Sequence, residues 1–288
     1  MSALFVGNPK TITRPVLERD ARMILRLLEE SWRVHLRLSR YNMEQKLRYI
    51  PGVLAEDQVG LRGFMLVEPQ PPEAAVIIAA GLRDTWGVKP FLEMLLPEAE
   101  QIAQRNNVAA LVYLGYEEWL IKSLPQYGFE PKDWILTFER QNSDSPPTIP
   151  ALAHIRTAHR NDLPILLSLD NIAFDHLWRK SAAHFGEALA YANSFSVAEV
   201  DGQIVGYEWC DIHQHRAHLT RLAVHPAYQG QGIGGQLLQQ AVVDVLSQGV
   251  SSITLNTQET NQRSRALYTR FGFVDTQQRI PVLWKMLN

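Results

Sequence analysis

The sequence predicts an α/β protein that contains two copies of one fold, each a mixed sheet with flanking helices. Similar segments recur along the 288 residues at an offset of 142 to 144, as between Arg14–Asp20 and Arg156–Asp162 and between Tyr127–Phe129 and Phe271–Phe273. An offset this steady is typical of duplication. Short strand patterns alternate with helical ones in each copy, and a polar, proline-rich stretch divides the chain nearly in half.

The second copy shows the order of elements most clearly. A short strand near His154 leads into two helices, and three strands, a helix, a strand and a second helix follow before a final strand pair. The predicted helices cover 161–173, 177–192, 232–247 and 261–270. The predicted strands cover 195–200, 204–212, 219–224, 252–257, 273–276 and 282–286.

The domain boundary is expected at the proline-rich stretch from Asn142 to Pro150. Such a segment favours extended backbone and contributes little to a core. The sequence therefore predicts a first domain at 1–141, a linker at 142–150 and a second domain at 151–288. The second domain is expected to fold and to bind its ligand as a separate fragment.

Composition is that of an ordinary globular protein, with 46% hydrophobic and 20% charged residues. The net charge of −2 and the absence of a basic stripe indicate no nucleic-acid or membrane partner. The single Cys210 excludes an internal disulfide and favours a cytoplasmic location. No clustered His and Cys residues indicate a metal site, and a homodimer is left open.

A glycine-rich run from Gln229 to Gly235 follows the strand pattern at 219–224 and opens the helix at 232–247. Glycine adopts positive φ without strain, so backbone N–H groups can surround a phosphate at the helix N-terminus. The spacing also fits a dinucleotide fingerprint. That alternative is disfavoured, because Pro226 and Tyr228 separate the strand from the glycines and the strand at 252–257 ends without an acidic residue.

Two blocks of sequence resemble the GNAT superfamily of N-acetyltransferases. Leu222-Ala223-Val224-His225-Pro226-Ala227-Tyr228-Gln229-Gly230-Gln231-Gly232-Ile233-Gly234 resembles the family's acetyl-coenzyme A loop. Asn261-Gln262-Arg263-Ser264-Arg265-Ala266-Leu267-Tyr268-Thr269-Arg270-Phe271-Gly272-Phe273 resembles its N-x-x-(A/S)-x-x-L-Y-x-x-x-G-F segment. The two blocks occur in the family's order, separated by one helix and one strand. The chain thus looks like a tandem GNAT protein with a degenerate N-terminal half.

The resemblance implies direct transfer of an acetyl group from acetyl-coenzyme A, the cosubstrate, to a primary amine of a small molecule or peptide. The coenzyme pyrophosphate would meet the loop, the pantetheine arm would meet the strand before it, and the second block would add polar groups. The implied coenzyme-binding residues are Leu222, Ala223, Val224, Gln229, Gly230, Gln231, Gly232, Ile233, Gly234, Gly235, Asn261 and Ser264. Asn261 is also a natural helix N-cap.

Tyr268 stands where the resemblance implies a general acid that reprotonates the coenzyme thiolate, since a phenol is protonated near neutral pH. Two residues are candidate bases for the acceptor amine. Glu208 interrupts an apolar strand where the first copy has Met65, and His218 begins the strand that leads to the loop. A water chain is a third alternative.

The first copy lacks the residues that carry this chemistry. Pro90 stands opposite Gly232 and has no N–H to donate, Leu92 stands opposite Gly234, and Leu124 stands opposite Tyr268. The first copy is therefore expected to serve as a scaffold. A non-catalytic acyl-coenzyme A binding module is the alternative for the whole chain, and the acceptor is not determined by the sequence.

Overall fold

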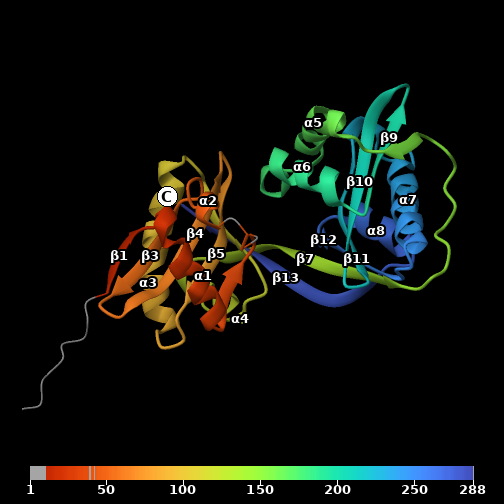
Figure 1. Ribbon diagram of the computed structural model, residues 1–288. Coiled ribbons are helices and arrows are strands. Elements are labelled where there is room, and N and C mark those ends of the chain that lie inside the picture. The colour runs from red at the N-terminus through yellow and green to blue at the C-terminus, as the bar shows by residue number, and fades with distance from the viewer. Residues whose placement is uncertain (1–10, 39, 42, 288) are drawn as a thin grey trace, which may run out of the picture. The chain divides into compact units, whose positions relative to one another are not determined.

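The computed structural model describes residues 11–38, 40–41 and 43–287, so the first ten residues of the predicted first domain lie outside the described part (Figure 1). The chain forms two compact units. Unit 1 contains Met1–Asp133 and Ile280–Asn288, and unit 2 contains Trp134–Arg279. Each unit is a mixed sheet with flanking helices, which confirms the predicted fold class.

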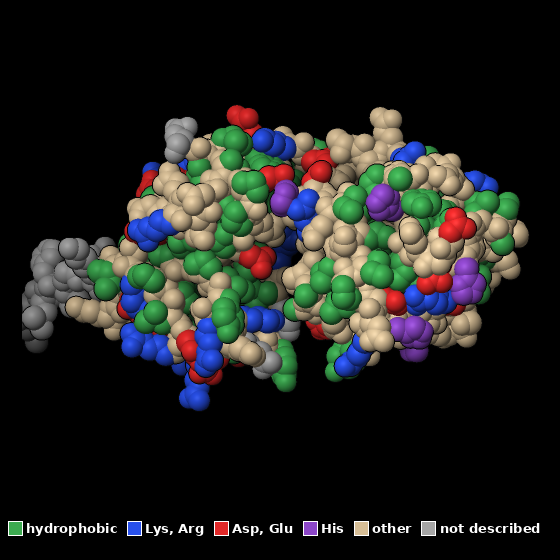
Figure 2. Space-filling model, turned by 90° about the horizontal axis from the view of Figure 1, so that it is seen from above, with side chains coloured by type: hydrophobic (Ala, Val, Ile, Leu, Met, Phe, Trp, Pro, Cys, Tyr) green, Lys and Arg blue, Asp and Glu red, His purple; other side chains and the backbone are tan. Residues whose placement is uncertain are grey.

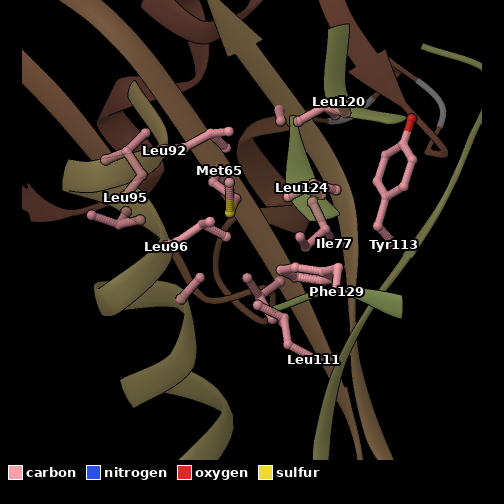
Figure 3. Close-up of a cluster of buried hydrophobic side chains, with 14 of the residues drawn as sticks. Met65, Ile77, Leu92, Leu95, Leu96, Leu111, Tyr113, Leu120, Leu124 and Phe129 are labelled. Carbon is pink, nitrogen blue, oxygen red and sulfur yellow. The ribbon is translucent and has the colours of Figure 1, made fainter. Parts of the chain in front are cut away.

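Unit 1 has the sheet order β1-β3-β4-β5-β6-β13, and β2 pairs with β5 outside this path. Its core lies between the sheet and α3 and includes Met65, Ile77, Leu95 and Phe129 (Figure 3). The strands are β1 (Ile12–Pro15), β2 (Arg33–Leu36), β3 (Gly52–Asp57), β4 (Gly60–Gln70), β5 (Ala74–Leu82), β6 (Ala110–Leu114) and the end of β13 (Val274–Met286). The helices are η1 (Glu18–Asp20), α1 (Ala21–Glu30), α2 (Met43–Lys46), α3 (Val88–Arg105), α4 (Glu118–Ile121) and η2 (Leu124–Tyr127).

Unit 2 has the sheet order β8-β9-β10-β11-β12-β7-β13. Helices α5 and α6 cover one face, and α7 and α8 cover the other (Figure 1). The strands are β7 (Glu130–Gln141), β8 (His154–Thr157), β9 (Ser194–Val200), β10 (Gln203–His213), β11 (Arg216–Val224), β12 (Ser252–Gln258) and the start of β13. The helices are η3 (Arg160–Asp162), α5 (Leu163–Ala173), η4 (His176–Trp178), α6 (Ala182–Tyr191), η5 (Pro226–Tyr228), α7 (Ile233–Ser247) and α8 (Gln262–Arg270).

Two predicted elements of the second copy are wrong in detail. The helix predicted at 177–192 is broken, because Lys180 N–H donates to Asp170 Oδ2 at 2.8 Å and the Ser181 side chain caps a new helix. The strand pair predicted at 273–276 and 282–286 is one long strand, β13. Gln277 lies inside this strand at φ +66°, a local irregularity that the alternation of side chains does not reveal.

Side-chain contacts repeat along with the fold. In unit 1, Arg14 pairs with Asp20 at 2.7 Å and with Glu56 at 2.8 Å. In unit 2, Arg156 pairs with Asp162 at 2.8 Å and with Glu199 at 2.8 Å. Each arginine joins the first strand of its copy to the following 3₁₀ helix and to the strand beside it in the sheet. An ion-pair network that recurs at the offset seen in the sequence supports duplication of a whole fold.

The two copies exchange their last strands. In unit 2, β7 of the first copy pairs antiparallel with β12, and in unit 1 the residues from Val282 to Met286 of the second copy pair with β6. Leu136 and Phe138 of β7 are buried in the core of unit 2. Arg140 is 2% exposed, and its Nε donates to the Phe271 carbonyl at 3.1 Å. The division in space therefore differs from the predicted boundary at 142–150.

The described surface carries charges of both signs. Figure 2 shows Lys and Arg intermixed with Asp and Glu on the face in view, without a stripe of one sign. Among the described residues, no helix is long and apolar enough to cross a membrane. Within the same residues, no group of three or more His, Cys, Asp or Glu side chains is arranged to hold a metal ion.

The strand exchange changes what a fragment of the second copy should do. We expect residues 150–288 to lose cooperative thermal unfolding, because this fragment lacks β7 and leaves the edge of β12 and the contacts of Leu136 and Phe138 unfilled. Residues 134–279, which contain all of unit 2, should unfold cooperatively in a calorimeter. A sharp transition in the fragment 150–288 alone would show that β7 is dispensable.

Candidate functional site

The candidate site begins where β11 and β12 separate. These parallel strands pair from Ala217↔Ile253 to Leu219↔Leu255, and β11 then continues to Val224 without pairing to β12. At this point the ladder with β10 skips Thr220, which is one extra residue on β11. A bulge of this kind bends a strand and ends regular pairing. The result is an opening between two neighbouring strands of unit 2.

The bulge also reverses the side-chain alternation of β11. Before the bulge, Ala217 and Leu219 pack in the core beneath α7 and α8, whereas after it Ala223 packs in the core beneath α5 and α6. The N–H of His225 donates to the carbonyl of Val205 in β10 at 2.8 Å. By the alternation of an antiparallel ladder, Val224 and Leu222 direct their backbone groups to the opening, and Ala223 directs its groups to β10.

The glycine loop lies between β11 and α7. Gly230 and Gly232 adopt φ of +83° and +91°, which only glycine adopts easily, and Gly232 is the N-cap of α7. No side chain caps this helix and its first turn has no acidic residue, whereas Ser181 caps α6 and Asn261 caps α8. The first-turn N–H groups of α7 have no partner within the helix and suit an anion.

The remaining loop residues differ in how strongly the structure constrains them. Ile233 is 2% exposed and anchors α7 in the core of unit 2. The Gln231 amide donates to the Ala227 carbonyl at 3.1 Å. A Cβ added at Gly234 or Gly235 would lie at 3.5 Å or more from its nearest neighbour, so these two positions are not sterically required to be glycine.

The second block of the sequence forms α8. Asn261 accepts the N–H of Ser264 at 3.1 Å, which confirms the predicted N-cap. Tyr268 is 7% exposed, and its ring lies 6.3 Å from that of Phe138 and 6.0 Å from that of Phe273. Burial raises the pKa of the Tyr268 phenol to about 12, against a smaller opposing effect of its hydrogen bond with Ser264. The phenol is protonated at neutral pH.

His218 lies on β11 just before the bulge, on the side of the sheet that α5 and α6 cover. Its Nδ1 is 2.9 Å from Thr254 Oγ1, and the Thr254 hydroxyl lies 3.2 Å from the Ala217 carbonyl. Burial lowers the pKa of His218, and the nearby charge of Asp211 opposes this effect. The imidazole is therefore neutral at pH 7 and can accept a proton.

Glu208 is fully buried on the opposite side of the sheet, beneath α7. Ser194 Oγ lies 3.0 Å from Glu208 Oε1 and 2.8 Å from Asp244 Oδ2, and Glu208 Oε2 has no hydrogen-bond partner. Burial raises the pKa of Glu208 to about 8, and the charge of Asp244 adds to the effect. A carboxyl group that is neutral at pH 7 cannot accept the proton of an ammonium group.

The structure brings some predicted residues together and separates others. The loop residues, Leu222, Val224 and the start of α8 surround one end of the opening between β11 and β12. Tyr268 belongs to the core beneath α7 and α8, and His218 lies on the other face of the sheet. In the described residues, no hydrogen bond or ring contact joins Tyr268, Glu208 and His218 to one another.

Arg263 is a residue of this region that sequence reasoning missed. Its Nη1 donates to Gln229 Oε1 at 2.6 Å, and a Cβ added at Gly230 would lie 3.3 Å from its Nη2. The guanidinium therefore lies directly against the glycine loop. Its position in the second block is one that the family pattern leaves variable, so the only signal in the sequence was a basic residue in the first turn of α8.

In unit 1 the strand β2 occupies the equivalent opening. β5 carries the corresponding extra residue at Ile78, and β2 pairs with β5 from Leu36↔Ala79 to Arg33↔Leu82. His35 in β2 is 1% exposed, with Nε2 3.0 Å from the Ile77 carbonyl and Nδ1 2.8 Å from Glu117 Oε2. The sequence did not predict this strand.

The glycine loop also has no counterpart in unit 1. α3 and α7 end at equivalent residues, Arg105 and Ser247, but α3 begins three residues earlier in the shared alignment. Pro90 therefore occupies the first turn of α3, where its missing N–H costs no hydrogen bond. An extra turn of helix stands in place of the loop.

Comparisons with known proteins agree with this geometry. Residues 161–273 match the Acetyltransferase (GNAT) family. A mycothiol acetyltransferase of Jonesia denitrificans is 27% identical over 206 residues, which span 65% of this chain and 66% of that protein. A mycothiol acetyltransferase of Acidimicrobium ferrooxidans is 29% identical over 97 residues, which span 32% of this chain and 31% of that protein.

A solved structure shares the fold over nearly the whole chain. A tandem GNAT protein from the clavulanic acid biosynthesis pathway, solved without acetyl-coenzyme A, has a TM-score of 0.68 and 14% identity. The similarity covers 96% of this chain and 98% of that chain. At this identity the likeness concerns the fold.

The raised pKa of Glu208 predicts how stability depends on pH. A group whose pKa is higher in the folded chain supports folding at pH below its ordinary value of 4.5 and loses that contribution as pH rises to about 8. The Glu208→Gln variant has no ionisable group at this position. Its free energy of unfolding should therefore increase relative to that of the parent by about 1.4 kcal/mol for each pH unit between 4.5 and about 8. Denaturant unfolding at pH 5, 6.5 and 8 measures the difference, and equal pH dependence in both proteins would show that Glu208 is ionised when folded.

Proposed function

The second half of the chain belongs to the GNAT acetyltransferase family, and we propose that the protein transfers an acetyl group from acetyl-coenzyme A to a primary amine of a small molecule or peptide. One observation carries the proposal. Unpaired backbone groups of β11 and the uncapped N-terminus of α7 lie at the same end of the opening between β11 and β12. A ligand with a phosphate at one end and amides along its length satisfies both sets of groups.

Different residues around the opening would bind different parts of this ligand. The first-turn N–H groups of α7 would bind the pyrophosphate, because they are unpaired and the helix dipole favours an anion. Gly230 and Gly232 keep the loop free of side chains where the phosphates approach. Leu222 and Val224 would pair with the pantetheine amides as a neighbouring strand would. These contacts direct the thioester towards Thr220, where β11 and β12 part.

Two side chains on opposite faces of the sheet can move the protons. The Thr254 hydroxyl donates to the Ala217 carbonyl, so His218 Nδ1–H donates to Thr254 and Nε2 carries the lone pair. His218 Nε2 would take a proton from the acceptor ammonium. As the amine nitrogen bonds to the carbonyl carbon and the C–S bond breaks, Tyr268 would protonate the sulfur, and the second proton lost by the nitrogen would restore the phenol through solvent. Glu208 is the weaker candidate base, because it is neutral and fully buried.

The acceptor would approach from the face that α5 and α6 cover, since His218 lies there. Asp170 of α5 is fully buried and accepts Arg221 Nε at 2.8 Å and Nη2 at 2.6 Å, which ties α5 to β11 just beyond the bulge. The guanidinium of Arg221 lies 3.4 Å from the centre of the Phe174 ring. Relatives named mycothiol acetyltransferase favour a small-molecule amine, and a peptide amine is the alternative acceptor.

We expect a single coenzyme site per chain, and the difference between the units supports this expectation. β2 covers the edge of β5 that corresponds to the open edge of β11, and a turn of α3 replaces the glycine loop. Unit 1 therefore offers neither the unpaired strand nor the phosphate loop, and the degenerate copy would act as a scaffold.

Titration calorimetry with acetyl-coenzyme A tests the site. We expect one equivalent bound per chain. Gly232→Pro should abolish binding, because proline cannot adopt φ of +91°. Gly234→Ala should bind within a few-fold of the parent and serves as the matched control, since its Cβ meets no atom closer than 3.6 Å. Two equivalent sites, or normal affinity in Gly232→Pro, would contradict the proposal.

Tyr268→Phe tests the chemical step in a thiol-release assay with a panel of small amines and peptides. Turnover should fall by about 10²-fold, the usual scale for loss of a general acid, while the Kd of acetyl-coenzyme A changes little. Because the pKa of Tyr268 is about 12, the parent should show no alkaline loss from this group below pH 10. Its acidic limb should lie below pH 6.5, since the pKa of His218 is lowered. Coenzyme binding without turnover on any amine would instead indicate a non-catalytic acyl-coenzyme A module.

A further inference from the structure

Arg263 of α8 holds a position that the proposed chemistry leaves unexplained. It is exposed, it lies against the glycine loop, and its hydrogen-bond partner is the neutral amide of Gln229. Across the described residues, no carboxylate lies within ion-pair distance of Arg263. An arginine that meets an amide oxygen beside an uncapped helix N-terminus has its charge available for an anion.

The side chain of Gln229 has two partners at once. Its Oε1 accepts from Arg263 Nη1 at 2.6 Å, and its Nε2 donates to the Val224 carbonyl at 3.0 Å. The first contact is one that a phosphate oxygen would make with the guanidinium. The second is one that an amide N–H of an added strand would make with β11. The Gln229 amide thus makes two hydrogen bonds, to Arg263 and to the Val224 carbonyl, that the bound coenzyme would make in its place.

We propose that Arg263 binds a phosphate of the coenzyme and that Gln229 is a stand-in that holds Arg263 and the Val224 carbonyl until the coenzyme displaces it. This inference rests on the proposed function, because it takes acetyl-coenzyme A as the ligand of the loop. It assigns to α8 a specific contact with the ligand in addition to the N-terminus of α7. It also replaces the direct coenzyme contact that the resemblance implied for the Gln229 side chain with a role that ends when the ligand binds.

The exchange is balanced in hydrogen bonds. When the ligand enters, Arg263 replaces a neutral acceptor with a charged one, which strengthens its bond. The Val224 carbonyl replaces one amide donor with another at little net change. The Gln229 side chain is exposed, so its amide can turn to water without leaving a buried group unpaired. Binding therefore gains a charge-assisted contact and leaves no polar group without a partner.

Arg265 offers a matched control on the same helix. It lies two residues further on, carries the same charge, and donates to the Glu259 carbonyl at 3.0 Å. It borders a separate surface pocket with Phe138 and Val274. Arg263→Gln and Arg265→Gln therefore change the net charge equally, and a difference between them reports the position of the guanidinium.

Titration calorimetry of the full chain with acetyl-coenzyme A and with its 3′-dephospho analogue is the test. Arg263→Gln should raise the Kd of acetyl-coenzyme A about tenfold or more, whereas Arg265→Gln should stay within about twofold of the parent. An equal loss for both ligands would assign the contact to the pyrophosphate, and a loss for acetyl-coenzyme A alone would assign it to the 3′-phosphate. Arg263→Lys should recover part of the affinity.

Gln229→Ala tests the stand-in itself. Removal of an internal competitor should lower the Kd, whereas an unchanged or raised Kd would show that Gln229 does not compete with the ligand. Equal affinities of Arg263→Gln and Arg265→Gln for both ligands would overturn the role of Arg263 while leaving the proposed function intact. A parent chain that binds neither ligand would remove both.

Discussion

The extra residue at Thr220 is the constraint on which the site depends. Backbone N–H and C=O groups in a sheet interior are almost always paired, because an unpaired buried group costs as much as a lost hydrogen bond. The bulge ends the pairing of β11 with β12 and leaves a stretch of strand whose groups need partners. The fold repeats this feature at Ile78 of unit 1. The two copies differ here, since β2 pairs with the edge in unit 1, whereas in unit 2 the edge is where the proposed coenzyme would pair.

The two faces of the unit 2 sheet have different chemical characters because of the same bulge. Beneath α7 and α8 the core is apolar around Tyr268, and the deeply buried Glu208 is neutral at pH 7. Beneath α5 and α6, Asp170 and Arg221 form a buried ion pair that Tyr207 joins through its hydroxyl. Arg221 reaches α5 only because the reversal after Thr220 turns it to that face. The proposed proton donor, Tyr268, and the proposed acceptor, His218, thus lie on opposite faces of the sheet.

Sequence reasoning found those features that depend on local patterns. The duplication, most element positions, the glycine loop and the N-cap at Asn261 follow from periodicity, residue type and spacing. The bulge at Thr220 was not predicted. Buried positions alternate without interruption across it, at Ala217, Leu219, Arg221 and Ala223, so the alternation does not mark the extra residue. The choice between Glu208 and His218 also needed the fold, since burial and neighbouring charges decide which group is neutral and basic at pH 7.

The strand exchange and the pairing of β2 with β5 in unit 1 could not be predicted for a different reason. Strand patterns identify segments that belong in a sheet, but they do not say which neighbour a strand will choose. β7 and the end of β13 hold equivalent positions, one beside β12 and the other beside β6, so the strand pattern does not distinguish an exchanged pairing from one within each copy. The pairing of β2 with β5 depends on His35 meeting Ile77 and Glu117 across more than forty residues, a contact that only the tertiary structure reveals.

The shared strand β13 has a consequence for how the chain is made. Synthesis proceeds from the N-terminus at about 5 to 20 residues per second. The first unit to begin is then the last to be completed, because β6 receives its neighbour only when the residues from Val282 to Met286 have been added. For roughly ten to thirty seconds the nascent N-terminal sheet has an open edge beside β6. Unit 2, Trp134–Arg279, is synthesised within that interval, so its own chain is complete shortly before unit 1 receives its last strand.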